Sequence, residues 1–85
     1  MYKKRDSIAK LFDISMRMVD TITKEISECG RYPKDAVLRD EGYVLLDVDV
    51  FQDYLFNRKN LKNKTTAKLV PAYKRNRLRY LNALD

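Results

Sequence analysis

The sequence contains no histidine, no tryptophan and a single cysteine among its 85 residues. Without histidine the chain cannot build a Ser-His-Asp triad or a histidine-containing zinc site, and one cysteine cannot form a disulfide within the chain. The sequence also shows no convergent acid–base pair, phosphate-binding loop or metal-ligand cluster. We therefore predict a protein that is not an enzyme and that needs no cofactor or metal.

Long apolar segments are missing as well. No stretch approaches the roughly 20 apolar residues that a membrane-spanning helix requires. The basic residues 1–5 are not followed by the apolar segment of a signal peptide. We therefore expect a cytoplasmic protein without a membrane partner. The length, together with an apolar fraction of 45% and a charged fraction of 35%, predicts one modest hydrophobic core.

Acidic residues are almost absent from the last third of the chain. Residues 58–85 carry nine Lys or Arg and one acidic residue, Asp85. Residues 36–57 have the opposite bias, with Arg39 against five acidic residues, and residues 1–35 are nearly balanced. The net charge of +6 favours a polyanionic partner, nucleic acid first and an anionic membrane surface second.

Two helices joined by a tight turn are predicted near the N-terminus. An Asp-Ser pair of good N-cap residues precedes the apolar face of a first helix at residues 7–12. Ser15 is the predicted N-cap of a second helix over residues 16–28. The apolar residues of this second helix recur every three or four positions, at Val19, Ile22 and Ile26.

The hydrophobic period changes after the second helix. Residues 36–39 and 43–46 are two short β-prone runs, and the Asp-Glu-Gly sequence between them is a good hairpin turn. Asp47 is the predicted N-cap of a third helix over residues 48–58.

The C-terminal third is predicted to contain a polar linker over residues 57–66 and a basic helix over residues 72–83. We divide the chain into residues 1–60, which hold the first three helices and the hairpin, and residues 61–85, which hold the linker and the basic helix. This order of elements predicts a mainly α fold with a small β-hairpin (α+β), arranged as a winged helix-turn-helix with a C-terminal basic helix.

Residues 7–19 have the spacing of a helix-turn-helix. Ala9 is small enough for the second helix to cross the first closely, Ile14 fills the elbow between them, and Val19 packs back from the second helix. Asp13 stands at the turn, where glycine is usual, and Asp tolerates a left-handed backbone better than most residues. A plain helical hairpin has the same pattern, so that alternative stays open.

Residues 6–58 resemble the phage and transposon excisionases and the related MerR-like winged helix-turn-helix domains. The resemblance rests on the 7–19 motif and on the hairpin-then-helix run at residues 43–55. It implies a sequence-specific, architectural DNA-binding protein of a mobile element, which bends double-stranded DNA and steers an integrase or recombinase towards excision. The alternatives are a small transcriptional repressor with the same DNA-binding surface and, from another class, an adaptor protein such as an antirepressor or replication accessory.

The second helix is the predicted base-reading element. Arg17 is the first candidate for a base contact, because a guanidinium bonds bidentately to guanine. A solvated helix face is the alternative, and we prefer it for Asp20 and Glu25. The further candidates for contacts to phosphates or thymine methyl groups on this helix are Ser15, Met16, Thr21 and Lys24.

The hairpin is the predicted wing. The basic residues beside it, Arg31, Lys34 and Arg39, are candidate DNA contacts. Its tip, Asp40 and Glu41, would be repelled by phosphate, so we expect the tip to face a basic surface of a neighbouring protomer if molecules associate along DNA.

The basic tail has two interpretations, contact with DNA phosphates or adsorption to an anionic membrane, and we prefer DNA because a reading helix precedes it. The candidate phosphate contacts in this segment are Lys62, Lys64, Lys68, Lys74, Arg75, Arg77 and Arg79.

The large aromatic residues need no ligand to explain them. We expect Phe12, Phe51, Tyr54 and Phe56 in the core, because a chain of this length needs large apolar side chains there. Cys29 is expected to be a small buried apolar residue.

Overall fold

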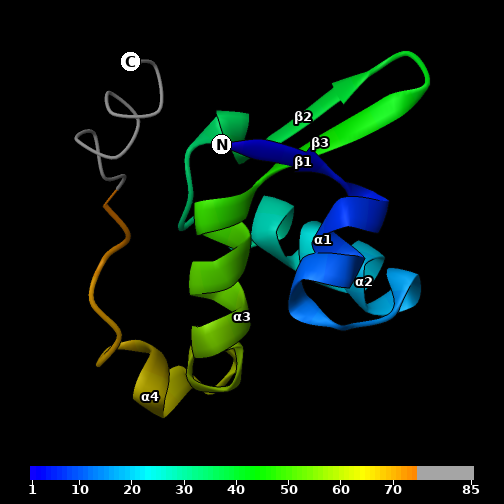
Figure 1. Cartoon of the computed structure of the whole chain (residues 1–85). Helices are drawn as coiled ribbons and strands as arrows, with labels where there is room; N and C mark the ends of the chain where they lie inside the picture. Colours follow the sequence, from blue (N-terminus) through cyan, green and yellow to red (C-terminus); the bar gives the residue numbers. More distant parts are fainter. Residues whose placement is uncertain (75–85) are drawn as a thin grey trace.

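The computed structural model describes residues 1–74, which form a mixed α+β domain (Figure 1). The predicted basic helix at 72–83 therefore lies mostly outside the described residues, and its residues 72–74 have no regular secondary structure. The elements in chain order are β1 (Tyr2–Lys4), α1 (Arg5–Phe12), α2 (Met16–Glu28), the short 3-10 helix η1 (Lys34–Ala36), β2 (Val37–Asp40), β3 (Tyr43–Asp47), α3 (Val48–Lys62) and α4 (Lys64–Ala67).

The three strands form an antiparallel sheet in the order β1-β3-β2. The predicted hairpin is confirmed, with β2 starting one residue later than expected. Its turn contains Gly42 at a φ of 84°, which glycine adopts without steric cost. Strand β1 was not predicted. It pairs with the other edge of β3, where Lys4 lies opposite Leu45.

The tight turn between α1 and α2 has the predicted left-handed residue. Asp13 adopts a φ of 54°, and its N–H donates to the Lys10 carbonyl at 3.4 Å. The Ile14 N–H donates to the Ala9 carbonyl at 3.0 Å, which completes the pair of backbone bonds of a Schellman motif. Helix α1 begins two residues earlier than predicted, because β1 leads directly into it.

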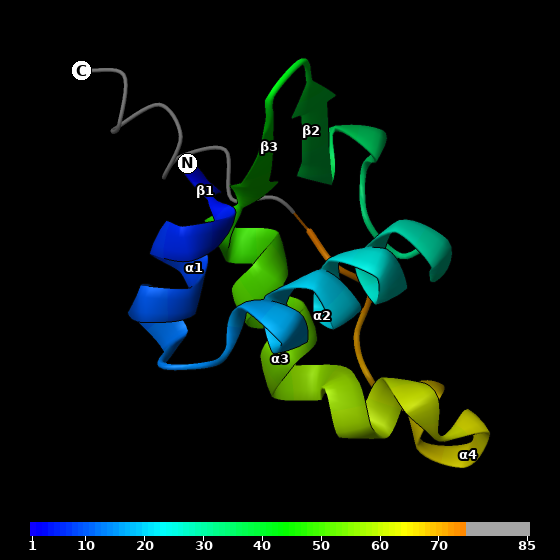
Figure 2. The ribbon, with the colours of Figure 1, turned by 90° about the vertical axis from the view of Figure 1, so that its right-hand side faces the viewer.

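Helix α2 has the predicted bounds. The Ser15 side chain accepts a hydrogen bond from the Met18 N–H at 3.1 Å, as an N-cap residue does. Its inner face carries the predicted apolar residues, all of them buried. Figure 2 shows α2 lying in front of α3, with the β2–β3 hairpin above it and α1 beside its N-terminal end.

The core lies between α1, α2, α3 and the sheet. Its largest fully buried side chains include Ile8, Ile22, Leu46 and Phe51. The Phe12 ring stacks on Phe51 with 5.4 Å between ring centroids.

Two expectations about buried residues were wrong. Phe56 is 69% exposed, because it projects from the side of α3 opposite to the buried Phe51 and Tyr54. Cys29 is exposed, because α2 ends at Glu28 and the chain turns away through Gly30.

Helix α3 runs four residues further than predicted, and the predicted linker at 57–66 is therefore wrong. The additional turn is held by Leu61, which packs against the core, and by contacts of Arg58 and Lys62 with Glu25 on α2. Asn63 then caps α4 by accepting a hydrogen bond from the Thr65 N–H at 2.9 Å. Among residues 1–74, no helix is long and apolar enough to cross a membrane.

Candidate nucleic-acid interface

The outer face of α2 carries three of the predicted contact residues. Arg17, Thr21 and Lys24 are exposed and follow one another at spacings of four and three, which places them on one side of the helix. The opposite side carries the buried Val19 and Ile22. The sequence pattern therefore separated the inner and outer faces of this helix correctly.

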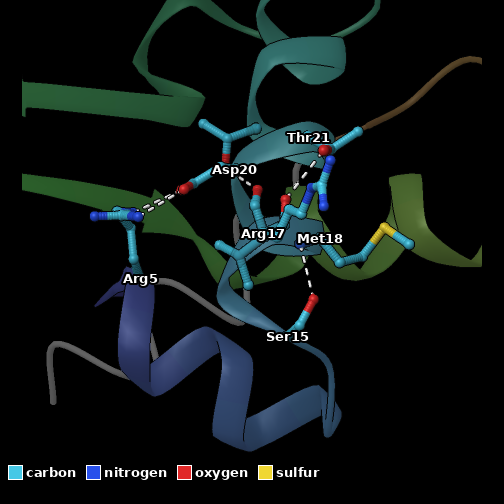
Figure 3. Close-up of polar contacts among 8 residues, drawn as sticks. Arg5, Ser15, Arg17, Met18, Asp20 and Thr21 are labelled. Atoms are coloured by element: carbon cyan, nitrogen blue, oxygen red, sulfur yellow. Dashed lines mark hydrogen bonds and ion pairs between the residues drawn. The ribbon is translucent and has the colours of Figure 1, made fainter.

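Ser15 and Met16, at the N-terminal end of α2, are the remaining predicted contacts on this helix, and Figure 3 shows the cap that Ser15 forms. The Ser15 hydroxyl oxygen accepts a hydrogen bond from the Met18 N–H, and within residues 1–74 its own hydrogen has no acceptor. The Thr21 hydroxyl donates to the Arg17 carbonyl at 3.0 Å, so this side chain offers its methyl group rather than a free donor. Met16 is 37% exposed beside them.

The basic side chains of this surface have no ion-pair partner in the part of the chain that the structure describes. Within residues 1–74, no carboxylate lies within ion-pair distance of Arg17, Lys24 or Arg39. All three side chains are exposed, so their positive charges face solvent.

A cleft separates the outer side of α2 from the hairpin. It measures about 270 Å³ and is lined by Arg5, Asp20, Thr23, Lys24, Arg39 and Val44. A second hollow of about 400 Å³ continues from it towards the hairpin tip, and Arg5 lines both. The structure thus brings Lys24 on α2 and Arg39 on β2 to one concave surface, although 15 residues separate them in the sequence.

Arg5 and Asp20 form a two-point ion pair in this cleft (Figure 3). Arg5 donates from Nε to Oδ1 of Asp20 at 2.7 Å and from Nη2 to Oδ2 at 2.6 Å. These hydrogen bonds raise the pKa of Arg5. From the sequence we expect a solvated Asp20 and no role for Arg5. No local pattern connects a residue at the start of α1 with one on α2.

Arg31 is engaged elsewhere in the fold. Its side chain is 14% exposed, its Nε lies 3.3 Å from Oδ2 of Asp53, and its guanidinium sits 5.6 Å from the centre of the Tyr32 ring. The Tyr32 hydroxyl donates to the same carboxylate at 2.6 Å. Burial lowers the pKa of Arg31, but hydrogen bonds with Tyr32 and Asp53 outweigh that effect and raise it. The residue joins the segment after α2 to α3.

Lys62 belongs to a network around Glu25. Arg58 donates to both oxygens of this carboxylate at 2.9 Å, and the Tyr54 hydroxyl donates at 2.8 Å. Lys62 Nζ lies 3.2 Å from Oε2. The hydrogen bonds from Arg58 first of all lower the pKa of Glu25 to about 2, against the effect of burial. The expectation of a solvated Glu25 is therefore wrong. Its carboxylate is the centre of a contact between α2 and α3.

The other predicted basic contacts are spread over several elements, and some of them lie outside the described residues. Lys34 opens η1 and lines, together with Arg39, a hollow of about 420 Å³ at the C-terminal end of α2. Lys64 begins α4, which lies at the end of the domain away from the hairpin (Figure 1). Lys74 lines a cavity of about 380 Å³ beside α3. Arg75, Arg77 and Arg79 lie outside the described residues.

Comparison of the chain with protein-family models, with curated proteins and with solved structures finds no match. Over the part of the chain that the structure describes, no group of three or more Cys, Asp or Glu side chains is arranged to hold a metal ion. The site is therefore defined by its own geometry, which is an exposed basic helix face beside a hairpin.

Proposed function

We propose that this protein binds double-stranded DNA in a sequence-specific manner, as a winged helix-turn-helix in which α2 is the reading helix and the β2–β3 hairpin is the wing. The observation that carries the proposal is the outer face of α2, where Arg17 and Lys24 have no carboxylate partner among residues 1–74. An α-helix with its side chains is about 10–12 Å wide, which suits a major groove of about 12 Å.

The exposed residues of α2 divide by chemistry into base and phosphate contacts. Arg17, near the N-terminal end of the helix, is suited to guanine, whose two acceptors match the fork of a guanidinium. Ser15 and Lys24 are suited to phosphate oxygens, which accept from a hydroxyl and an ammonium group. The exposed thioether of Met16 is suited to a thymine methyl group.

The hairpin supports the same placement. Arg39 lines the cleft beside α2 and lies on the flank of the hairpin, where it would reach a phosphate. The acidic tip at Asp40 and Glu41 lies beyond this contact. On this arrangement, the flank of the wing contacts DNA and the tip does not.

The biological role that we propose follows the resemblance of residues 6–58 to excisionases. The protein would act as an architectural DNA-binding factor of a mobile element and would work with an integrase or recombinase. A transcriptional repressor would use the same surface and differs in the arrangement of its sites. An adaptor protein would not need the charges of Arg17 and Lys24 for its activity.

Selection of duplexes from a random-sequence pool, followed by footprinting on DNA upstream of the coding sequence, tests this proposal. We expect an enriched motif, and direct repeats in the footprint would favour the architectural role whereas a palindrome would favour repression. The double variant Arg17→Ala/Lys24→Ala should lose the motif while staying folded.

The matched control is Lys59→Ala/Lys68→Ala, which removes the same charge from two exposed positions, one in the last turn of α3 and one at the C-terminal end of α4. These positions are phosphate candidates at most and not base contacts. The control should retain the motif. No enrichment with the wild-type protein, or equal loss in both double variants, would contradict sequence reading by α2.

A further inference from the structure

Arg5 and Asp20 form an ion pair in the cleft, and the proposed DNA contacts give neither residue a role. Arg5 comes from the first residue of α1, yet it lines both the cleft between α2 and the hairpin and the hollow that leads to the hairpin tip. Its side chain is 43% exposed and that of Asp20 is 53% exposed, so the pair is open to a ligand that enters the cleft.

The geometry of the pair leaves donors available. A guanidinium has five N–H groups, and Asp20 accepts from Nε and from one N–H of Nη2. Among residues 1–74, the remaining three N–H groups of Arg5 have no hydrogen-bond acceptor. Because both contacts with Asp20 use the same side of the guanidinium, the pair fixes the direction in which Nη1 points.

The path of a DNA strand through the proposed complex passes this position. If α2 enters the major groove and the hairpin lies over the neighbouring minor groove, the phosphodiester strand that separates the two grooves runs between the helix and the hairpin. The cleft at that place presents three cations, Arg5, Lys24 and Arg39, and one carboxylate, which is already paired with Arg5.

We propose that Arg5 is a phosphate-binding residue and that Asp20 is its positioning residue, which holds the guanidinium towards the DNA strand in the cleft. This inference rests on the proposed function and names a further contact in it. The alternative is that the pair braces α1 against α2 and has no part in binding. The two explanations predict opposite signs for one substitution.

Asp20→Asn separates them. Removing a negative charge from a surface that faces DNA strengthens binding if the charge is all that matters. If Asp20 positions Arg5, the asparagine offers one acceptor instead of two, the guanidinium loses its orientation, and binding weakens several-fold although the protein becomes more positive. In an Arg5→Gln background no guanidinium remains to be positioned, so the same substitution should strengthen binding.

The experiment measures fluorescence anisotropy of a labelled duplex, taken from the selected pool, between roughly 50 and 200 mM salt. Arg5→Gln should weaken binding and reduce the slope of log K against log salt by about 1, as loss of one phosphate contact does. Arg5→Lys should retain the slope but bind more weakly, because an ammonium cannot satisfy the fork geometry.

Glu28→Gln is the control, since Glu28 is an exposed acidic residue at the end of the same helix. It should bind as tightly as the wild type or more tightly, and thermal melting should show every variant folded. The inference is overturned if Asp20→Asn strengthens binding as the control does, or if Arg5→Gln leaves the salt slope unchanged. A wild-type protein that binds no duplex would instead overturn the proposed function itself.

Discussion

Arg17 and Lys24 lie on the same face of α2, seven residues apart, and differ in what they can recognise. A guanidinium forms two directed hydrogen bonds to one base, whereas an ammonium group acts as a point charge. If α2 binds DNA, Arg17 therefore contributes to specificity and Lys24 to affinity.

We predict that Arg17→Ala costs about 1–3 kcal/mol on the selected duplex and relaxes the preference at one base pair. Lys24→Ala should weaken binding to all duplexes alike and reduce the salt slope by about 1. Binding titrations against a set of single-base variants of the selected duplex measure both effects. Equal, sequence-independent losses for the two variants would show that Arg17 does not read a base.

The contacts of Glu25 with Arg58, Tyr54 and Lys62 give the folded protein a stabilisation that depends on pH. The pKa of Glu25 is lowered from 4.5 to about 2 in the folded protein, so its contribution is complete above the unfolded value and is lost as the pH falls from 4.5 towards 2. A shift of this size corresponds to at most about 3 kcal/mol of stability at neutral pH.

Glu25→Gln should therefore lower the free energy of unfolding at pH 7 and flatten its dependence on pH in this acidic range. Urea denaturation at a series of pH values measures it. The control Glu28→Gln, in which the exposed carboxylate of the same helix is replaced, should keep the wild-type pH dependence. An unchanged pH profile in Glu25→Gln would refute the role of this network.

The turn between α1 and α2 sets the angle at which α2 leaves α1. It depends on Asp13 at a φ of 54°, where a residue with a Cβ atom is strained. We expect Asp13→Gly to raise the free energy of unfolding by up to about 1 kcal/mol, and Asp13→Val to lower it by about 1–2 kcal/mol. Thermal melting of the two variants provides the comparison, and equal melting temperatures would show that the backbone conformation at this turn has no energetic consequence.

The acidic tip of the β2–β3 hairpin is the predicted contact between protomers that bind side by side on DNA. The Asp40 carboxylate holds the turn, since it accepts from the Glu41 N–H at 2.7 Å and from the Tyr43 hydroxyl at 3.2 Å. Glu41→Lys is therefore the cleaner test, and it should reduce the cooperativity of a gel-shift titration on DNA with adjacent sites. Unchanged cooperativity would show that the acidic tip makes no contact between protomers.

The sequence predicted the helices and strands whose ends are set by residues close by in the chain, such as a capping side chain or a turn. The bounds of α2 follow from the Ser15 cap and from the apolar period, and the hairpin follows from its Asp-Glu-Gly turn. Strand β1 is formed because Tyr2–Lys4 pair with the distant strand β3. Its three residues are too few to show a strand pattern of their own. The partners of Glu25 on α3 are 29 to 37 positions away in the sequence, and no local pattern could connect them.

The basic residues are likewise more dispersed than the sequence suggested. Arg31 and Lys62 are engaged in contacts with Asp53 and Glu25, while Arg5, which was not a candidate, lies in the cleft. Among residues 1–74, fewer of the predicted basic residues lie at the α2 surface than the net charge of the chain suggests. In the described part of the chain, the cations of this region lie at known positions on α2 and in the lining of the cleft.

The most direct test of the central claim maps where DNA binds. Amide chemical shifts of the ¹⁵N-labelled protein, recorded during titration with the selected duplex, report contact residue by residue. The account predicts that the largest changes fall in the first two turns of α2, at Arg5 and along β2. Changes confined to α3 and α4, with α2 unaffected, would contradict it.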